Sequence, residues 1–166
     1  MSSAENKEAS LMDLILWRHA EAHELTEHQQ DDLARPLSAR GTKQAQRMGS
    51  WLDEHMPSET RVLCSPALRC TSTADALHRK FKICPELAPD QDDVALLEIA
   101  NWPEAKQPVL VIGHQPNLGL VIGRLLGWQG HAISVHKGSI WWLRSRLRLG
   151  QRQTIVHCVH TPDMIW

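Results

Sequence analysis

Two histidines stand where apolar runs of the sequence end. Residues 14–17 are apolar and lead into Arg18 and His19, and the apolar run at residues 109–113 leads to His114. A short apolar run bounded by polar residues is typical of a buried strand. Because ligands of open α/β sheets bind beyond the carboxyl ends of the strands, both histidines are candidates for a site at that edge.

A third strand-like run, residues 60–66, ends at a proline, and Arg69 lies in the first turn of the helix expected after it. In a parallel sheet the three strand ends meet at one edge. Two guanidinium groups and two imidazoles at one place repel one another unless an anion lies between them, and the planar fork of arginine matches phosphate. Helix starts after Pro66 and Pro116 direct backbone N–H groups there. These residues predict a phosphate pocket.

The histidines would give this pocket a nucleophile. A neutral imidazole can attack phosphorus and become a phosphohistidine, which water then hydrolyses. The second histidine and the arginines would hold the equatorial oxygens. No P-loop motif is present, so a nucleotide cradle of that kind is not expected. No metal site is expected either, because His19, His23 and His28 lack the glutamate of an H-E-x-x-H motif and a nearby cysteine.

The elements that would carry these residues alternate between strands and helices. Hydrophobic periodicity predicts strands at 14–17, 60–66 and 109–112, a short edge strand at 82–87, and two final strands within 139–162 joined at 149–151. Periodicity together with capping residues and stop signals predicts helices at 67–80, 92–102 and 118–127, and a helix from Ser38 or Thr42 to Pro57. In the helix at 67–80, Leu68 and Leu77 would face the core. Residues 21–35 read as a loop with room for a short helix.

This alternation favours an α/β fold, a three-layer αβα sandwich with a mainly parallel sheet and a final antiparallel pair of strands at its edge. A length of 166 residues suits one domain. We assign residues 12–166 to this domain and residues 1–11 to a polar N-terminal tail that frays.

Composition limits the partners of the chain. The formal net charge of −1 provides no global field for nucleic acid. No apolar run approaches the ~20 residues that a membrane span needs, and the first dozen residues lack the apolar core of a signal peptide. The four cysteines form no C-x-x-C pair. Free thiols and a cytoplasmic location are therefore expected.

Four segments of the sequence together resemble a known family. WRHAEA, RPLSARGTKQA, SPALRCTSTA and VIGHQPNLG are similar, in order and spacing, to the histidine phosphatase superfamily with its phosphoglycerate-mutase-like fold, and most of all to its small SixA-type phosphohistidine phosphatases. The resemblance implies that His19 is the phosphorylated nucleophile, that Arg18 and Arg69 bind the phosphate, and that His114 is the second pocket histidine. It also implies that Arg35 approaches the phosphate. It implies no cofactor, and a phosphorylated protein as partner, for example a histidine-phosphotransfer domain.

Two positions depart from the family pattern. The usual R-H-G is R-H-A here, with Ala20, which is acceptable where the backbone needs no positive φ. Larger members carry an acidic proton donor after the SPALR helix, and Glu86 and Asp90 do not fit that donor pattern. A phosphohistidine needs no such donor, because a protonated phosphoimidazole departs as neutral imidazole.

Three functions remain open at this point. The first is a metal-independent phosphatase that acts on phosphohistidine in a protein, and the short chain favours it because little sequence remains for insertions that grip small substrates. The second is a phosphatase of small phosphomonoesters, which would need an acid such as Glu86. The third is a non-catalytic phosphate-binding module, against which the intact pair of His19 and His114 argues.

Overall fold

One mixed sheet forms the centre of the computed structural model, which describes residues 11–128 and 130–164. Across the sheet the strands are ordered β3-β2-β4-β1-β5-β6. Their bounds are β1 (Met12–Arg18), β2 (Arg61–Cys64), β3 (Lys82–Ile83), β4 (Val109–Gly113), β5 (Ile140–Arg148) and β6 (Gln151–His160). Strands β1 to β4 pair in parallel, and β5 and β6 extend the sheet in antiparallel fashion. The predicted α/β fold class is confirmed.

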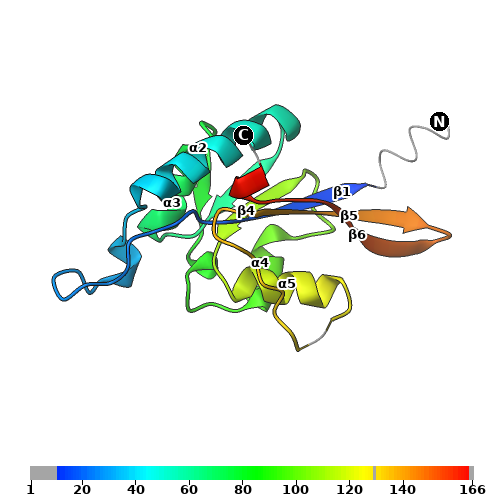
Figure 1. Cartoon of the computed structure of the whole chain (residues 1–166). Coiled ribbons are helices and arrows are strands. Elements are labelled where there is room, and N and C mark those ends of the chain that lie inside the picture. Colours follow the sequence, from blue (N-terminus) through cyan, green and yellow to red (C-terminus); the bar gives the residue numbers. More distant parts are fainter. Residues whose placement is uncertain (1–10, 129, 165–166) are drawn as a thin grey trace.

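Helices cover both faces of this sheet (Figure 1). The helices α2 (Ala39–His55) and α3 (Leu68–Asp75) pack on one face, and α4 (Asp93–Ala100) and α5 (Asn117–Leu125) pack on the other. The connections hold the 3-10 helices η1 (Asp32–Ala34), η2 (Pro85–Leu87) and η3 (Pro162–Met164). Successive side chains of β1 alternate between the two buried clusters, as a strand between two helix layers requires.

The start of α2 is fixed against the chain that follows β1. Ser38 is the N-cap, and its side chain accepts a hydrogen bond from the backbone N–H of Gly41. Gly41 packs so closely on the backbone of Glu21 that a Cβ atom there would overlap the Glu21 carbonyl. The helix therefore lies directly beside the segment that leaves the predicted site.

The helix predicted at 67–80 is shorter in the structure than predicted, and it buries a different face. It ends at Asp75. Leu68, which was expected to face the core, is exposed, whereas Leu77 is buried as predicted. The buried side of α3 is formed by Arg69, Cys70, Thr73 and Ala74. The prediction of Leu68 is wrong because an apolar pattern over two turns cannot reveal that an arginine occupies the inner face.

The N-terminal tail is largely untested. Residues 1–10 of the predicted tail lie outside the described residues, and the division into 1–11 and 12–166 stays a prediction. Within the described part of the chain, no helix is long and apolar enough to cross a membrane.

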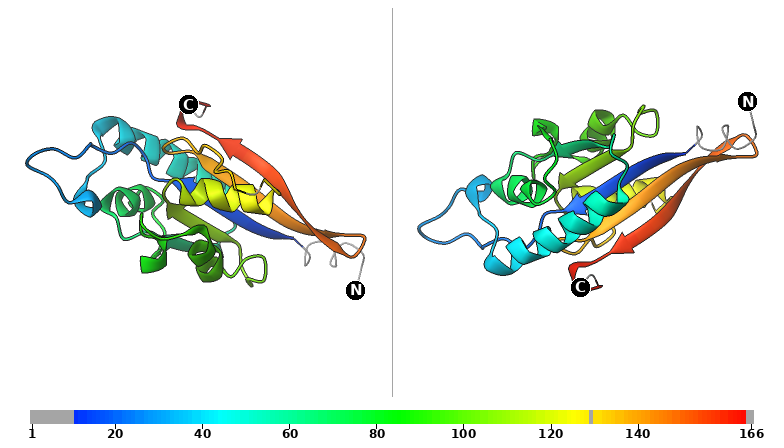
Figure 2. Two further views of the ribbon diagram at one scale, coloured as in Figure 1. Left: turned by 90° about the horizontal axis from the view of Figure 1, so that it is seen from below. Right: turned by 90° about the horizontal axis from the view of Figure 1, so that it is seen from above.

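The parallel strands bring their carboxyl ends to one edge of the sheet, where Arg18 lies opposite Gly113. Because β5 runs antiparallel to β1, its first residue, Ile140, lies beside Trp17. The segment 134–139 before β5 therefore reaches the same edge. The tip of the β5–β6 hairpin projects at the other end of the molecule (Figures 1 and 2).

Candidate active site

The edge of the sheet brings the two predicted histidines together. The backbone N–H of His19 donates to the oxygen of Gly113 at 3.2 Å, which joins the end of β1 to the end of β4. The ring centroids of His19 and His114 lie 5.3 Å apart, and both residues are buried. At this separation one tetrahedral phosphoryl group can contact both rings.

The hydrogen bonds of His19 determine which of its nitrogens can act as a nucleophile. Nδ1 lies 2.8 Å from the backbone oxygen of Ala20. A carbonyl oxygen only accepts, so Nδ1 carries the proton and Nε2 carries the lone pair. Burial lowers the pKa of His19 to about 3, against the opposing effect of the Ala20 hydrogen bond, and the charges of Arg18 and Arg69 lower it further. The ring is therefore neutral at pH 7.

His114 is oriented by groups from β2 and α3. Its Nε2 lies 2.8 Å from Oγ of Ser65, and its Nδ1 lies 3.4 Å from the guanidinium of Arg69. Because a guanidinium only donates, Nδ1 accepts from Arg69 and Nε2 carries the proton. Burial, followed by the charge of Arg69, lowers the pKa of His114 to about 3. This ring is also neutral at pH 7.

Arg18 connects the end of β1 to the segment before β5. Its guanidinium donates to the oxygen of Val135 at 2.8 Å, and its backbone N–H donates to the oxygen of Ser139 at 3.0 Å. Burial and then the charge of Arg69 lower the pKa of the Arg18 guanidinium. The two arginines are thus close enough to repel each other, and an oxyanion between them would relieve that repulsion.

Arg69 is buried, and it extends from the first turn of α3. One of its terminal nitrogens donates to the backbone oxygen of Asp32 at 2.8 Å, and the other lies 3.1 Å from the Asp32 carboxylate. The helix layer and the ion pair together fix the plane of the guanidinium beside His114.

Asp32 is a residue of this site that the sequence did not indicate. Its carboxylate pairs with Arg69 and, at 3.0 Å, with Arg35. Burial acts to raise the pKa of Asp32, but the hydrogen bonds and charges of the two arginines outweigh it and hold the pKa below its ordinary value. Asp32 is an ionised counter-ion at neutral pH. The one available signal was its i, i+3 spacing from Arg35, which suits an ion pair.

Arg35 is joined to this cluster through Asp32. Its Nε donates to Asp32 at 3.0 Å, and a terminal nitrogen donates to the backbone oxygen of His23 at 3.0 Å. The charge of Arg35 contributes to the lowered pKa of His114. Its field therefore reaches the pocket, although its hydrogen bonds lie on the side of η1.

The two acids considered as proton donors have no link to the cluster. Glu86 and Asp90 are exposed. Within residues 11–128 and 130–164 neither forms a hydrogen bond or an ion pair, and neither affects the pKa of His19 or of His114. Over the same residues, no group of three or more His, Cys, Asp or Glu side chains is arranged to hold a metal ion.

The side chains at this edge have the composition of a phosphoryl-transfer site. A neutral imidazole offers a nitrogen lone pair, and buried guanidinium groups can stabilise the charge on the equatorial oxygens of phosphorus. The fold and the site together are those expected of an α/β protein that handles phosphoryl groups with a pair of histidines.

Known proteins share this combination. The model of the histidine phosphatase superfamily (branch 1) matches residues 14–99. A phosphohistidine phosphatase SixA homologue from Haemophilus influenzae is 30% identical, in a match that covers 78% of this chain and 85% of the relative. The chain therefore belongs to the histidine phosphatase superfamily, as the resemblance predicted.

Solved structures agree with this assignment. The protein histidine phosphatase SixA in complex with tungstate is 25% identical, with a TM-score of 0.70 and coverage of 92% of this chain and 98% of that one. The α-ribazole phosphatase of Shigella flexneri is 24% identical, with a TM-score of 0.59 and coverage of 87% and 95%. At that identity the second likeness shows the fold alone.

Proposed function

We propose that this protein is a metal-independent phosphatase that removes phosphate from phosphohistidine in another protein through a covalent intermediate on His19. The observation that carries the proposal is the state of His19. Its Nε2 holds a lone pair, its ring is neutral because burial lowers its pKa to about 3, and the charges of Arg18 and Arg69 act on it. The likeness to SixA proteins supports the same substrate class.

In the first step Nε2 of His19 attacks the phosphorus of the substrate. The new P–N bond forms as the P–N bond of the substrate breaks, and the leaving imidazole keeps the electron pair of that bond. Arg18 and Arg69 bind the phosphoryl oxygens, and His114 donates to one of them the Nε2–H that otherwise points to Ser65. Arg35, which is paired with Asp32, adds positive charge. These interactions stabilise the charge that spreads over the oxygens in the transition state.

In the second step water attacks the phosphorus on His19. The P–N bond to Nε2 breaks with its electron pair on the ring, and phosphate leaves with the oxygen and the protons of the water. The hydrogen bond from Nδ1 to the oxygen of Ala20 keeps the ring in the same tautomer, so Nε2 regains its lone pair and is ready for the next cycle.

The leaving group favours phosphohistidine over phosphoesters. An alkyl ester releases an alkoxide unless an acid protonates it, a contribution of roughly 10²–10⁴-fold. The carboxyl group of Asp32, which pairs with Arg69, is kept ionised by its two arginines, and Glu86 and Asp90 are exposed, with no contact to the site among the described residues. A phosphoimidazole protonated on its distal nitrogen leaves as neutral imidazole and needs no acid. Among the residues that the structure describes, neither Asp32 nor Glu86 nor Asp90 supplies the proton donor that the alternative, a phosphatase of small phosphomonoesters, would need.

The partners and the location follow from the same proposal. A phosphorylated protein is the substrate, with a histidine-phosphotransfer domain as one candidate, and phosphate is the product. The four cysteines are free thiols, which suits the reducing cytoplasm that we propose as the location.

A side-by-side assay tests the proposal. Phosphate release from a phosphohistidine protein is compared with release from a panel of alkyl phosphomonoesters, with and without EDTA. We expect kcat/KM for the phosphohistidine protein to be higher by orders of magnitude and insensitive to EDTA. Equal rates on alkyl esters, lost in Glu86→Gln or Asp90→Asn, would establish the phosphomonoesterase instead. A complete loss in EDTA that a divalent ion restores would refute metal independence.

A further inference from the structure

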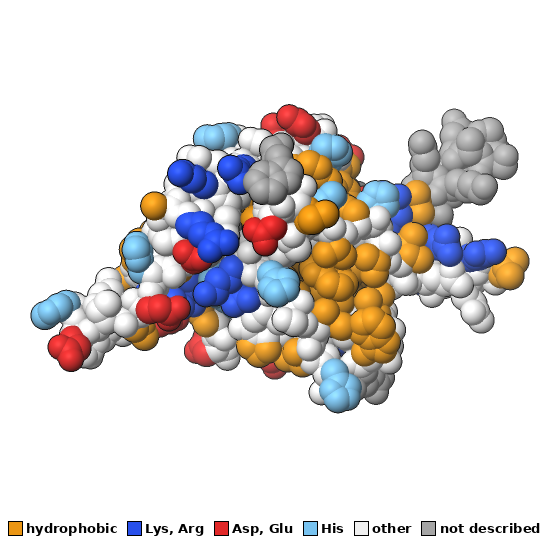
Figure 3. Space-filling model, in the orientation of Figure 1, with side chains coloured by type: hydrophobic (Ala, Val, Ile, Leu, Met, Phe, Trp, Pro, Cys, Tyr) orange, Lys and Arg blue, Asp and Glu red, His pale blue; other side chains and the backbone are white. Residues whose placement is uncertain are grey.

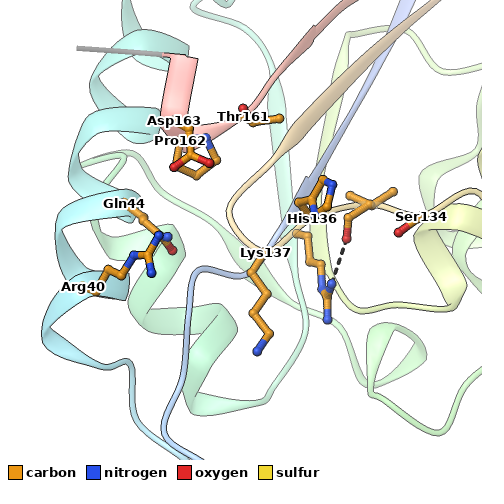
Figure 4. A pocket seen from close by; sticks show the side chains of 10 residues that line it. Arg40, Gln44, Ser134, His136, Lys137, Thr161, Pro162 and Asp163 are labelled. Carbon is orange, nitrogen blue, oxygen red and sulfur yellow. Dashed lines mark hydrogen bonds between the residues drawn. The ribbon is translucent and has the colours of Figure 1, made fainter.

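A basic pocket lies next to the candidate phosphate site. It has a volume of about 460 Å³. Its walls come from the start of α2, from the segment 134–137 and from residues 161–163 (Figure 4). The side chains that matter for its chemistry are Arg18, Arg40, Gln44, His136, Lys137 and Asp163.

Arg18 belongs to both sites. It precedes His19 in the chain, and its guanidinium lines the basic pocket while it donates to the oxygen of Val135, the dashed line in Figure 4. Hydrogen bonds fix the adjoining segment to the end of β1. The backbone N–H of Gly138 donates to the oxygen of His19 at 2.9 Å, and Trp17 Nε1 donates to the oxygen of Gly138 at 3.1 Å. The two sites therefore share a fixed boundary.

Positive charge exceeds negative charge in this pocket. Among its described lining residues, Arg18, Arg40 and Lys137 face one acid, Asp163. Lys137 is exposed and has no carboxylate within 4 Å in the described part of the chain. The carboxylate nearest to Arg40, that of Glu21, is 3.9 Å away, and the Arg40 side chain is 69% exposed. Figure 3 shows Lys and Arg side chains gathered on one face of the molecule.

On the basis of the proposed function, we propose that the basic pocket binds carboxylate side chains of an acidic segment that flanks the phosphohistidine in the substrate protein. Because Arg18 belongs to both sites, a phosphoryl group held at His19 places the chain on one side of the substrate histidine within reach of the basic pocket. Asp or Glu residues of that segment would meet Lys137, which has no carboxylate within 4 Å among the described residues, and Arg40, whose pair with Glu21 is long and exposed. The negative charge of Asp163 repels a phosphate dianion in the basic pocket more strongly than it repels a single carboxylate.

We expect the basic pocket to make the protein select acidic substrate segments over uncharged ones. Charge pairs at partly exposed positions are weak individually, so two of them should change affinity by about tenfold. Salt should reduce this difference in affinity, because the Debye length falls to ~3 Å in 1 M salt and the exposed charges are then screened.

The test uses two peptides with the same non-hydrolysable phosphonate analogue of phosphohistidine, one flanked by Asp and Glu and the other by Asn and Gln. Their Kd values are measured by calorimetry on the full chain. We expect the wild type to bind the acidic peptide about tenfold more tightly, and the ratio to fall to about one in the double variant Arg40→Glu, Lys137→Glu. Lys106→Glu, an exposed charge reversal before β4, should keep the wild-type ratio.

Equal binding of the two peptides by the wild type, or a ratio that survives the double variant, would overturn the inference. The ratio compares two ligands on one protein, so a general loss of stability in the variant cancels. Turnover of the corresponding phosphohistidine peptides is measured in parallel. If neither peptide is hydrolysed, the proposed function fails, while the Kd ratio still decides whether the pocket prefers carboxylates.

Discussion

The chemistry of single residues explains how this site tolerates a cluster of cationic side chains. Two histidines beside Arg18 and Arg69 would raise the repulsion further if they were protonated. Burial and the arginine charges lower the pKa of both rings to about 3, so the rings stay neutral and become competent nucleophiles or hydrogen-bond partners. Asp32 offsets part of the remaining charge through its ion pairs.

Arg69→Lys tests the role of the guanidinium fork. Lysine keeps the charge but cannot bind Asp32, His114 and a phosphate oxygen in one plane. We expect kcat/KM toward a phosphohistidine protein to fall by about 10²-fold, which corresponds to ~2.7 kcal/mol. The matched control is Arg124→Lys, which alters an exposed ion pair with Asp93 and should leave kcat/KM unchanged. A loss of less than about threefold in Arg69→Lys would place Arg69 outside the phosphate site.

The site residues that follow regular strands and helices were predictable from the sequence. His19 and His114 follow buried strands whose ends must meet in a parallel sheet, and Arg69 follows a third strand at a helix start. Asp32 was missed because it lies in the aperiodic stretch 21–35, where no element constrains which side chain points to the pocket. Its position depends on the tertiary contact with Arg69, which no local pattern encodes.

At the scale of elements, the candidate site and the β5–β6 turn lie at opposite ends of the sheet. The parallel strands place the site at one edge, and the antiparallel β5 returns the segment 134–139 to that edge. The opposite end carries the turn between β5 and β6. Both turn residues, Leu149 and Gly150, have positive φ, at 51° and 74°, which is the backbone of a type I′ hairpin turn.

Leu149→Asn tests this assignment of the turn. Leucine is disfavoured at positive φ, whereas asparagine tolerates it, and the Leu149 side chain is 97% exposed, so its removal loses almost no packing. We expect an increase of up to about 1 kcal/mol in the free energy of unfolding, since asparagine avoids part of the cost of the left-handed conformation, measured in urea, with unchanged kcat/KM. Leu149→Ala removes the same side chain without the preference of asparagine and should not stabilise the protein. An equal gain from both variants would rule out the turn explanation.

Helices and strands were predictable where the sequence marks both of their ends, with a capping residue, a proline or a turn. Ser38, one of the two predicted caps, is the N-cap of α2, the helix ends before Pro57 as predicted, and the final hairpin has its turn within 149–151. The face of α3 was not predictable in the same way. Over so short a helix the pattern allowed Leu68 to point inward, but the buried position belongs to Arg69, whose burial depends on a partner from another part of the chain.

At the scale of the whole molecule, the neutral histidines couple folding to pH. In the folded chain the pKa of His19 and of His114 is about 3, while an unfolded histidine has a pKa of ~6.5. Between these values the unfolded chain binds protons that the folded chain excludes. The stability from the neutral rings is therefore complete above pH 6.5 and decreases as the pH falls, by up to about 1.4 kcal/mol per pH unit for each ring.

His19→Asn should reduce this pH dependence. Asparagine does not titrate, and it keeps an N–H that can reach the oxygen of Ala20. Between pH 7 and pH 5 the free energy of unfolding of the variant should decrease by about 2 kcal/mol less than that of the wild type. Denaturant unfolding at the two pH values measures this difference, with His28→Asn, at an exposed position, as the control that follows the wild type. Identical decreases in the wild type and His19→Asn would show that His19 is protonated in the folded protein near pH 5.

The central claim is that His19 carries the phosphoryl group during turnover. It is tested most directly by mixing the enzyme with a phosphohistidine protein that contains radioactive phosphorus, stopping the reaction in alkali, and mapping the labelled peptides. We expect the label on His19 and no label on the His19→Asn variant. A label on another residue, or equal labelling of the enzyme without His19, would contradict it.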